Sequence, residues 1–261
     1  MKVFHAMRRA LLATLLLGLS VSAALAADIQ VITSGAFSAA LDQLAPAYER
    51  QSTNKVVISH GASMGTAQDA IPTRLARGEK FDILILARPS LDGFADQGKV
   101  DPATRVDLAA STIGAAVRKG APKPDISTVD ALRKTLLQAK SIAYSASASG
   151  TYLSTELFPK LGVAEQLKDT AKKIYSERVG TVVARGDAEL GFQQVSELLP
   201  IEGIDFLGEI PPEVQQTVFF SAGITRDAQN LEAAKDLIRF LTSAQAAPII
   251  KKTGMNPVVA K

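Results

Sequence analysis

Short apolar runs alternate along the chain with amphipathic stretches, and three of the runs lead into loops of small polar residues. Residues 29–33 form a β-branched run that predicts a strand, and residues 41–48 then repeat apolar side chains at the spacing of one helix face. The runs at 55–59 and 81–86 predict two more strands, of which the second is apolar apart from Asp82 near its start, as in a strand buried on both faces of a parallel sheet. This alternation predicts an α/β fold.

The same alternation continues along the rest of the chain. The loop at 61–66 is expected to open a helix that runs toward residue 77. The later predicted elements are a strand at 141–144, a polar loop at 145–150, a helix at 151–161, a helix at 179–185, a strand at 189–194, an extended segment at 215–223 and a closing amphipathic helix around 233–241.

Two extended segments, at 113–118 and 218–223, lie where the chain can cross from one lobe to another and return. With hinges there, lobe one comprises residues 28–111 and 219–261, and lobe two comprises residues 112–218. The alternative is that both segments are ordinary strands of one large α/β domain. A mature length of about 235 residues suits two modest lobes, each with its own core.

The N-terminus has the pattern of a secretory signal peptide over residues 1–26. Three basic residues precede an apolar run at 10–19, and residues 24–26 form an A-x-A cleavage pattern. A membrane helix is the alternative, but this run is shorter than the roughly 20 apolar residues that a span needs. We expect export by general secretion, and the absence of cysteine excludes a lipid-anchored start and a disulfide framework.

The charge balance does not point to a nucleic-acid partner. The chain has 29 basic and 26 acidic residues, and cleavage removes three basic ones, which leaves 26 against 26. With 5% aromatic residues there is no stacking platform, so nucleic-acid binding is excluded. The sequence has no cluster with metal-ligand spacing and no phosphate-binding, dinucleotide or serine-hydrolase motif.

The loops after the predicted strands carry the candidate chemistry. Backbone N–H groups at a helix start lack partners within the helix and carry partial positive charge, so they bind anions, and hydroxyls add neutral donors. The alternative is that these Ser and Thr residues only cap helices. Three such loops at the carboxyl ends of strands favour a ligand site. The candidate donors are Ser34, Ser38, Ser63, Thr66, Ser147, Ser149 and Thr151.

Two further residues near these loops have open roles. His60 directly precedes the loop at 61–66 and is either a structural residue at a strand end or a titrating group beside an anion. Arg88 follows the strand at 81–86 and either reaches the rim of a cleft or is a solvated loop charge.

Six segments, in their order and spacing, resemble the ModA-like branch of the type II periplasmic substrate-binding proteins, the molybdate-binding relatives. They are SGAFSAALDQLAPAYE, GASMGT, FDILILARPSLD, SASGTY, ARGDAELGFQQVSE and FLTSAQAAPIIKKTG. The resemblance covers essentially the whole mature chain. It implies a two-lobed type II fold with two hinge crossover strands, a small anion in the interlobe cleft and delivery to the permease of an ABC importer. We expect a periplasmic monomer without a cofactor.

The resemblance also implies ligand contacts at matching positions of this chain. They are a first-loop serine at Ser34 or Ser38, a second-loop serine at Ser63, a backbone contact at Ser149 beside Tyr152, and the residue before a helix-opening GT at Arg178 or Val179. The family's ligand-contacting tyrosine falls on Gln194, which departs from the molybdate pattern. An amide both donates and accepts, and the guanidinium of Arg178 suits a carboxylate, so an organic acid fits at least as well as molybdate.

Two functional hypotheses follow. The first is a binding protein whose lobes close around a small carboxylate or oxyanion, without covalent chemistry. The alternative is an enzyme, because this branch is also similar to periplasmic aconitate isomerase, which interconverts trans- and cis-aconitate. That allylic proton shift needs donors for three carboxylates, which Arg178, Gln194 and the serine loops can supply. It also needs a base, for which His60 and Tyr152 are the candidates.

Overall fold

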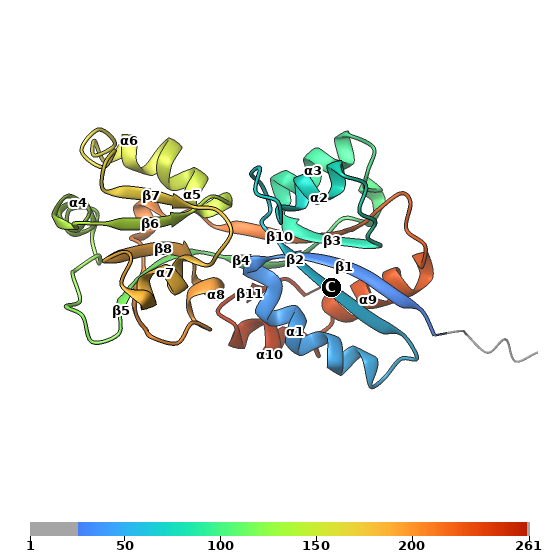
Figure 1. Ribbon diagram of the computed structural model, residues 1–261. Coiled ribbons are helices and arrows are strands. Elements are labelled where there is room, and N and C mark those ends of the chain that lie inside the picture. The colour runs from blue at the N-terminus through green and yellow to red at the C-terminus, as the bar shows by residue number, and fades with distance from the viewer. Residues whose placement is uncertain (1–25, 260–261) are drawn as a thin grey trace, which may run out of the picture.

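The computed structural model describes residues 26–259, in which two mixed β-sheets stand side by side and each is packed with helices (Figure 1). The predicted α/β fold with two lobes is confirmed. The predicted signal peptide lies outside the described residues, apart from its last residue, Ala26. Within residues 26–259, no helix has the length and apolar character needed to cross a membrane.

The first sheet has six strands and carries five α-helices and a short 3-10 helix. The strands are β1 (Asp28–Ser34), β2 (Lys55–Gly61), β3 (Ile83–Ala87), β4 (Val106–Ser111), β10 (Val218–Ile224) and β11 (Asn256–Pro257). The helices are α1 (Gly35–Glu49), α2 (Ile71–Ala76), α3 (Arg88–Asp96), η1 (Pro102–Thr104), α9 (Leu231–Leu241) and α10 (Ala247–Lys252). The order across the sheet is β11-β4-β10-β3-β1-β2, with β1 parallel to β2 and β3, and β10 antiparallel to β3 and β4.

The second sheet has five strands in the order β7-β6-β8-β5-β9. The strands are β5 (Ile113–Arg118), β6 (Ile142–Ser145), β7 (Ala171–Ile174), β8 (Leu190–Gln194) and β9 (Ile204–Glu209). The helices are α4 (Val129–Gln138), α5 (Ala148–Tyr152), the π-helical turn η2 (Leu153–Leu157), α6 (Phe158–Lys160), α7 (Val179–Arg185), α8 (Val195–Leu198) and η3 (Pro212–Val214). β6 is parallel to β7 and β8, and β5 is antiparallel to β8 and β9.

Strand β3 shows how the first sheet is buried on both faces. Ile83 and Ile85 belong to a core that includes residues of α1 and α9, whereas Leu84 and Leu86 belong to a second core with residues of α2 and α3. Successive side chains of a strand point to opposite faces, which explains why every side chain from Ile83 to Leu86 is apolar. The sheet is nevertheless mixed and not parallel throughout, because β10 and β4 enter it in the opposite direction.

In the second sheet, a glycine brings α7 close to β8. A Cβ added at Gly191 would lie 2.8 Å from Val179 and would also collide with Val183, both on α7. Because Gly191 has no side chain, the first turn of α7 packs directly on β8. The backbone N–H of Val179 also donates to Oε1 of Gln193 at 2.8 Å, so the start of α7 lies beside the end of β8, where Gln194 lies.

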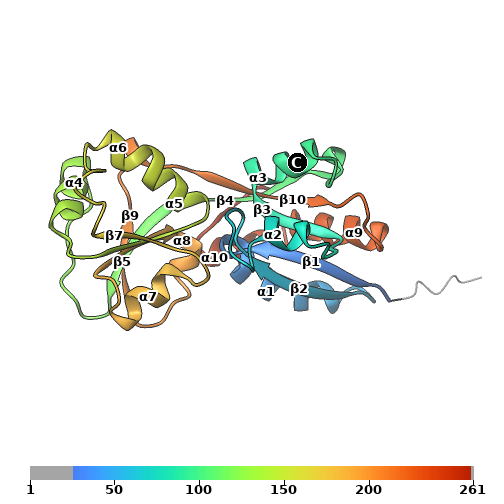
Figure 2. The same ribbon diagram turned by 45° about the horizontal axis from the view of Figure 1, so that its top comes forward.

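The chain passes between the sheets at two places. β4 ends at Ser111 and β5 begins at Ile113, and the chain returns after η3 into β10 (Figures 1 and 2). Val218, at the start of β10, pairs with Ser111 in the first sheet. We propose that the hinges lie at these two passages, with the lobe boundaries predicted at 111/112 and 218/219.

Several predicted elements differ from the observed ones. The helix expected to open in the loop at 61–66 begins only at Ile71, because residues 62–70 form bends and turns and Pro72 suits the first turn of a helix. The predicted loop at 145–150 is shorter, since α5 already starts at Ala148. Beyond α9, which was expected to close the chain, α10 and β11 follow, and β11 pairs with β4.

Candidate functional site

A pocket of about 170 Å³ lies between the two sheets and is lined by residues of both. The first sheet contributes the end of β1 with the start of α1, and the end of β2 with the loop that follows it. The second contributes the loop before α5, the start of α7, and the end of β8 with α8. The polar lining residues used below are Ser34, Ser38, His60, Ser63, Ser149, Arg178, Gln193, Gln194 and Glu197.

Three helices begin at the wall of this pocket. Ser34 precedes α1, Ser147 precedes α5 and Arg178 precedes α7, and none of these three side chains makes a capping hydrogen bond to its helix. The partial positive charge at these helix starts therefore faces the pocket without a capping side chain. Such a wall suits an anion.

Two buried side chains in the pocket have polar atoms without a hydrogen-bond partner in the described part of the chain. They are Oγ of Ser34 and both amide atoms, Nε2 and Oε1, of Gln194, and each residue is only 2% exposed. A buried polar group without a partner costs about 1–3 kcal/mol. These atoms are therefore the strongest candidates for direct ligand contacts, and they come from opposite sides of the pocket.

Glu197 is a functional candidate that the sequence analysis missed. Its Oε1 accepts a hydrogen bond of 2.9 Å from Nε2 of Gln193, whose Oε1 accepts one of 2.8 Å from the backbone N–H of Val179. A Cβ added at Gly35 would collide with the Glu197 carboxyl group, so this group lies directly against the start of α1. The Glu197 carboxyl group on α8 thus contacts both the first-sheet side of the pocket, at Gly35, and the second-sheet side, at Gln193.

Burial raises the pKa of Glu197 from 4.5 to about 7, against the opposing effects of the Arg178 charge and the Gln193 hydrogen bond. Desolvation disfavours the ionised form of a carboxyl group. Near neutral pH this carboxyl group is therefore present in both forms and can take up or release a proton, as a general acid or base requires.

Arg178 supplies positive charge on the same side of the pocket. It is partly buried, lies at the residue before α7, and lowers the pKa of Glu197 through its charge. The structure thus brings Arg178 to the wall of the pocket that the buried Gln194 also lines.

Ser38 and His60 form the opposite wall. Oγ of Ser38 lies 3.1 Å from Nδ1 of His60 and donates to the backbone oxygen of Ser34 at 3.1 Å. Nε2 of His60 lies 3.7 Å from a carboxylate oxygen of Asp42, one turn further along α1. His60 is therefore part of a chain of polar contacts and not an isolated residue.

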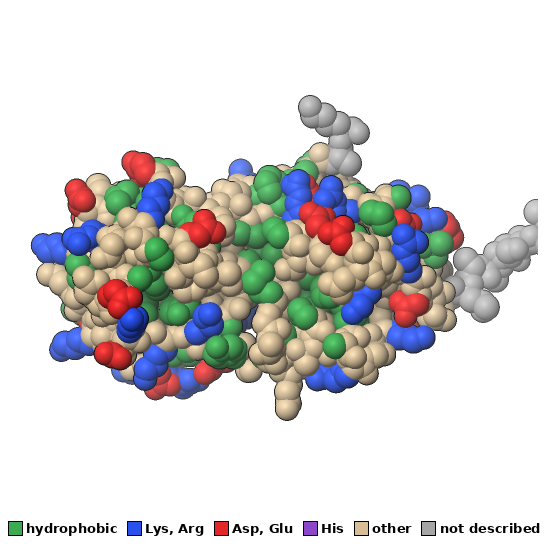
Figure 3. All heavy atoms as spheres, turned by 90° about the horizontal axis from the view of Figure 1, so that it is seen from above, with side chains coloured by type: hydrophobic (Ala, Val, Ile, Leu, Met, Phe, Trp, Pro, Cys, Tyr) green, Lys and Arg blue, Asp and Glu red, His purple; other side chains and the backbone are tan. Residues whose placement is uncertain are grey.

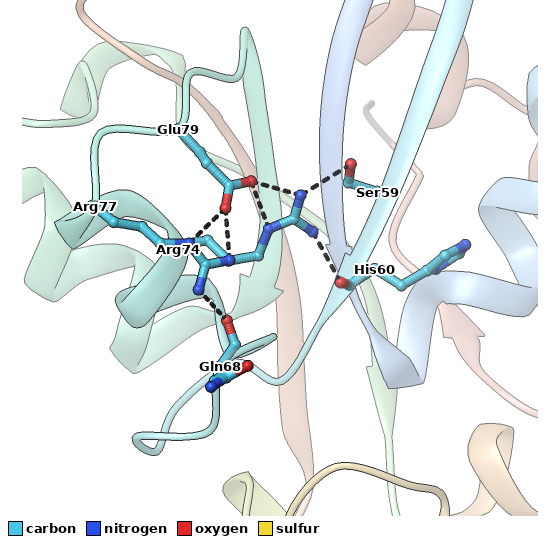
Figure 4. Close-up of polar contacts among 6 residues, drawn as sticks. All are labelled: Ser59, His60, Gln68, Arg74, Arg77 and Glu79. Carbon is cyan, nitrogen blue, oxygen red and sulfur yellow. Dashed lines mark hydrogen bonds and ion pairs between the residues drawn. The ribbon is translucent and has the colours of Figure 1, made fainter.

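The strand that carries His60 is held by a cluster of charged residues outside the pocket (Figure 4). Arg74 donates to the backbone oxygen of His60 at 3.2 Å and to Oγ of Ser59 at 3.4 Å, and it pairs with Glu79. Arg77 pairs with the same carboxylate and donates to the backbone oxygen of Gln68 at 2.7 Å. Arg74, followed by Arg77, holds the pKa of Glu79 below its usual value. The cluster thereby fixes both the end of β2 and the loop that follows it.

Ser63 and Ser149 are also brought to the pocket, and both are 1% exposed. Oγ of Ser63 accepts a hydrogen bond of 3.0 Å from the backbone N–H of Ala87, which leaves its hydroxyl proton for another acceptor. Ser149 lies in the first turn of α5.

Thr66, Tyr152 and Arg88 are not brought to the pocket. Thr66 is exposed in the loop that the sequence assigned to a helix. The Tyr152 hydroxyl donates to the backbone oxygen of Val214 at 2.8 Å, and burial raises its pKa, so the geometry does not support it as a base. Arg88 pairs with Asp107 at 3.1 Å and lies over the ring of Phe219.

On the face in Figure 3, hydrophobic side chains gather along the junction of the two halves.

The residues described by the structure contain no group of three or more His, Asp or Glu side chains placed to hold a metal ion. The chemistry available in the pocket includes hydroxyls, two side-chain amides, one guanidinium, one imidazole and one carboxyl group with a raised pKa.

Comparisons with known proteins agree with this arrangement. Residues 29–256 match the family model described as bacterial extracellular solute-binding protein. The chain is 44% identical over 233 residues to an aconitate isomerase of Pseudomonas sp., covering 89% of each protein. It is 25% identical over 242 residues to the molybdate-binding protein ModA of Azotobacter vinelandii, covering 91% of this chain and 93% of that one.

Solved structures show the same fold. The periplasmic molybdate-binding protein of Azotobacter vinelandii superposes with a TM-score of 0.72 at 22% identity, over 90% of this chain and all of that one. Peb3 from Campylobacter jejuni gives a TM-score of 0.65 at 17% identity, over 88% and 99% of the two chains. The resemblance drawn from the sequence is confirmed. With a family model matched along nearly the whole described chain, this protein belongs to the bacterial extracellular solute-binding protein family.

Proposed function

We propose that this protein is a periplasmic isomerase that binds aconitate between its lobes and interconverts the trans and cis isomers. The observation that carries the proposal is Glu197, a carboxyl group with a pKa of about 7 on the wall of a pocket that otherwise presents anion-binding groups. Similarity over 89% of the chain to an aconitate isomerase supports the choice of substrate.

The pocket offers separate donors for the carboxylates of such a substrate. On one side lie Oγ of Ser34, the hydroxyl of Ser63 and the start of α1, and on the other lie the Gln194 amide and Arg178. Donors on both lobes hold the substrate in one orientation, which is the condition for proton transfer between fixed atoms.

The reaction moves one proton and one double bond. Ionised Glu197 takes a proton from the methylene carbon, the electron pair of that C–H bond forms the new double bond, and the old double bond opens toward its far carbon. The same Glu197 proton is then returned to that far carbon, so the glutamate is regenerated. Negative charge that builds up on the adjacent carboxylate is stabilised by Arg178 and by the N–H groups at the start of α1.

The structure changes which residue we assign to the proton step. His60 was a candidate base, but its Nδ1 faces Ser38 and its Nε2 faces Asp42. Glu197 has only one hydrogen-bond partner in the described chain, Gln193, and borders the pocket. We therefore assign the proton transfer to Glu197.

Proton NMR of trans-aconitate incubated with the protein tests this assignment. We expect conversion to the cis isomer by the wild type, and binding without conversion by Glu197→Gln, because the amide keeps the shape and cannot take up the proton. The exposed Glu202→Gln is the matched control and should convert at the wild-type rate. Full activity in Glu197→Gln would remove this residue from the mechanism, and an inactive wild type would refute isomerisation itself.

The second candidate function is capture of a small carboxylate for the permease of an ABC importer, by a monomeric protein. The two passages between the sheets favour it, because they allow the lobes to close around a ligand. A wild type that binds aconitate tightly and never converts it would support this function instead.

A further inference from the structure

Gln193 connects Glu197 to the start of α7. It lies on β8 two residues after Gly191, so both residues face the side of the sheet on which α7 packs. Its Oε1 accepts a hydrogen bond of 2.8 Å from the backbone N–H of Val179, and its Nε2 donates one of 2.9 Å to Oε1 of Glu197. Gln193 is 3% exposed, so bulk water has little access to either bond.

The donor and acceptor roles in this chain of contacts are fixed by chemistry. A backbone N–H only donates, so the amide atom of Gln193 that faces Val179 is the oxygen. The amide nitrogen therefore faces Glu197, and because it only donates, Oε1 of Glu197 accepts in both the ionised and the neutral form. In the neutral carboxyl group the carbonyl oxygen is the better acceptor, so the proton lies on the other oxygen, Oε2.

The two oxygens of Glu197 have different surroundings. Oε1 is held by Gln193, and it is the atom that a Cβ added at Gly35 would meet first, so it lies against the start of α1. Oε2 has no hydrogen-bond partner in the described chain, and unlike the amide atoms of Gln194 it is not fully buried. Since Glu197 lines the pocket, Oε2 is the oxygen that remains for a ligand there.

We infer that Gln193 is a positioning residue, which holds Oε1 of Glu197 and thereby makes Oε2 the atom that takes the proton from the substrate carbon and returns it. In this step the C–H bond breaks, an Oε2–H bond forms, and the electron pair of the C–H bond becomes the new double bond. The same proton then passes from Oε2 to the far carbon. The inference rests on the proposed isomerisation, because it names the atom through which Glu197 acts.

The Gln193 bond also affects the pH range in which Glu197 is ionised. Burial raises the pKa of Glu197 to about 7, and the charge of Arg178, followed by the Gln193 hydrogen bond, opposes this rise. Loss of the Gln193 donor should therefore raise the pKa of Glu197 further. The first turn of α1 has no acidic residue, and the other titratable groups at the pocket or on the adjoining α10 are His60, Asp69, Tyr175, Glu177, Lys251 and Lys252.

Gln193→Leu removes the donor to Glu197 and tests the inference. Carboxyl 13C NMR follows the pKa of Glu197 as the resonance that is absent in Glu197→Gln. We expect this pKa to rise by about one pH unit in Gln193→Leu, the size of one hydrogen bond to a charged group. The pH profile of kcat for trans-aconitate should shift in the same direction, with little change in KM. In infrared difference spectra, the C=O band of protonated Glu197 should move to higher frequency, because its carbonyl oxygen loses a hydrogen bond.

Gln193→Glu is a second variant that keeps the bond to Val179. The introduced side chain has the same length and an oxygen for the Val179 N–H, but it presents an acceptor to Glu197 where the amide presented a donor. Two adjacent carboxyl groups do not both ionise readily, so the pKa of Glu197 should rise and kcat at about pH 7 should fall about tenfold. Gln138→Leu and Gln138→Glu, at an exposed position of α4, are the matched controls and should behave as the wild type.

The outcomes separate this inference from the proposed function. An active wild type whose Gln193 variants keep both the pKa of Glu197 and the pH profile of kcat would overturn the role of Gln193. A change in KM alone would also overturn it, because it would make Gln193 a ligand contact. A C=O band that does not move would overturn the assignment of the proton to Oε2. A wild type that never converts trans-aconitate would instead refute the proposed function.

Discussion

Replacing Glu197 with Gln should make the folded protein more stable at alkaline pH. The pKa of Glu197 is raised from 4.5 to about 7 by burial, so the folded protein holds this proton more tightly than the unfolded chain does. The contribution of Glu197 to stability is therefore fully present below about pH 4.5 and is lost as the pH rises through about 7. A glutamine in its place is neutral throughout and carries no such loss.

The size of the effect follows from the two pKa values. Each pH unit between them corresponds to about 1.4 kcal/mol, so the full loss is about 3 kcal/mol. Most of it falls between about pH 5 and about pH 8. For a chain of this size, 1 kcal/mol changes the melting temperature by about 2–4 °C, so the expected change is about 5–10 °C.

Thermal unfolding of the wild type and of Glu197→Gln at both pH values measures this difference. The melting temperature of the variant minus that of the wild type should be about 5–10 °C larger at about pH 8 than at about pH 5. Other titrating groups occur in both proteins and cancel, and Glu202→Gln should follow the wild type. Melting curves of the wild type and Glu197→Gln that shift in parallel with pH would show that this carboxyl group is not buried as described.

Three further predictions concern the pocket. Arg178→Ala should weaken carboxylate binding by about 2–5 kcal/mol and Arg178→Lys by less, since the ligand loses a planar charged partner; calorimetry that finds unchanged affinity in Arg178→Ala removes this residue from the site. Gly35→Ala places a Cβ where the Glu197 carboxyl group lies and should abolish conversion, whereas Gly93→Ala, with no atom within 4 Å, should not. Tricarboxylates should compete with molybdate in a thermal-shift panel and bind more tightly, because Gln194 and Arg178 suit carboxylates.

Local pattern was enough to predict most of the first lobe and the serine loops. The β-branched run of β1, followed by small residues and a helix face, predicts both the element and the place where Ser34 and Ser38 lie. Thr66 was a candidate donor because its hydroxyl lies in a loop that follows a predicted strand and was expected to open a helix, but α2 begins only at Ile71, with Pro72 in its first turn, and Thr66 is exposed. Tyr152 lies outside the pocket and its hydroxyl donates to the backbone oxygen of Val214, a direction that the sequence of a helix turn does not give.

Glu197 was missed because its environment is created by distant parts of the chain. In sequence it is an acidic residue in a four-residue helix, α8, where an exposed carboxylate is the ordinary expectation. Its burial results from the start of α1, which is far away in the sequence, and from the Gln193 hydrogen bond across the end of β8. The available signal was four polar residues at and just after the end of a buried strand, Gln193, Gln194, Ser196 and Glu197, of which only Gln194 was used.

The same glutamate bears on the choice between capture and catalysis. For a protein that only binds anions near neutral pH, Glu197 is unfavourable twice. Its ionised form repels the ligand, and its burial removes about 3 kcal/mol of stability at alkaline pH. Glutamine at this position would avoid both effects and keep the hydrogen bond with Gln193. A group that weakens binding and folding, yet has its pKa near neutrality inside the pocket, is what proton transfer requires, so Glu197 favours the isomerase over the binding protein.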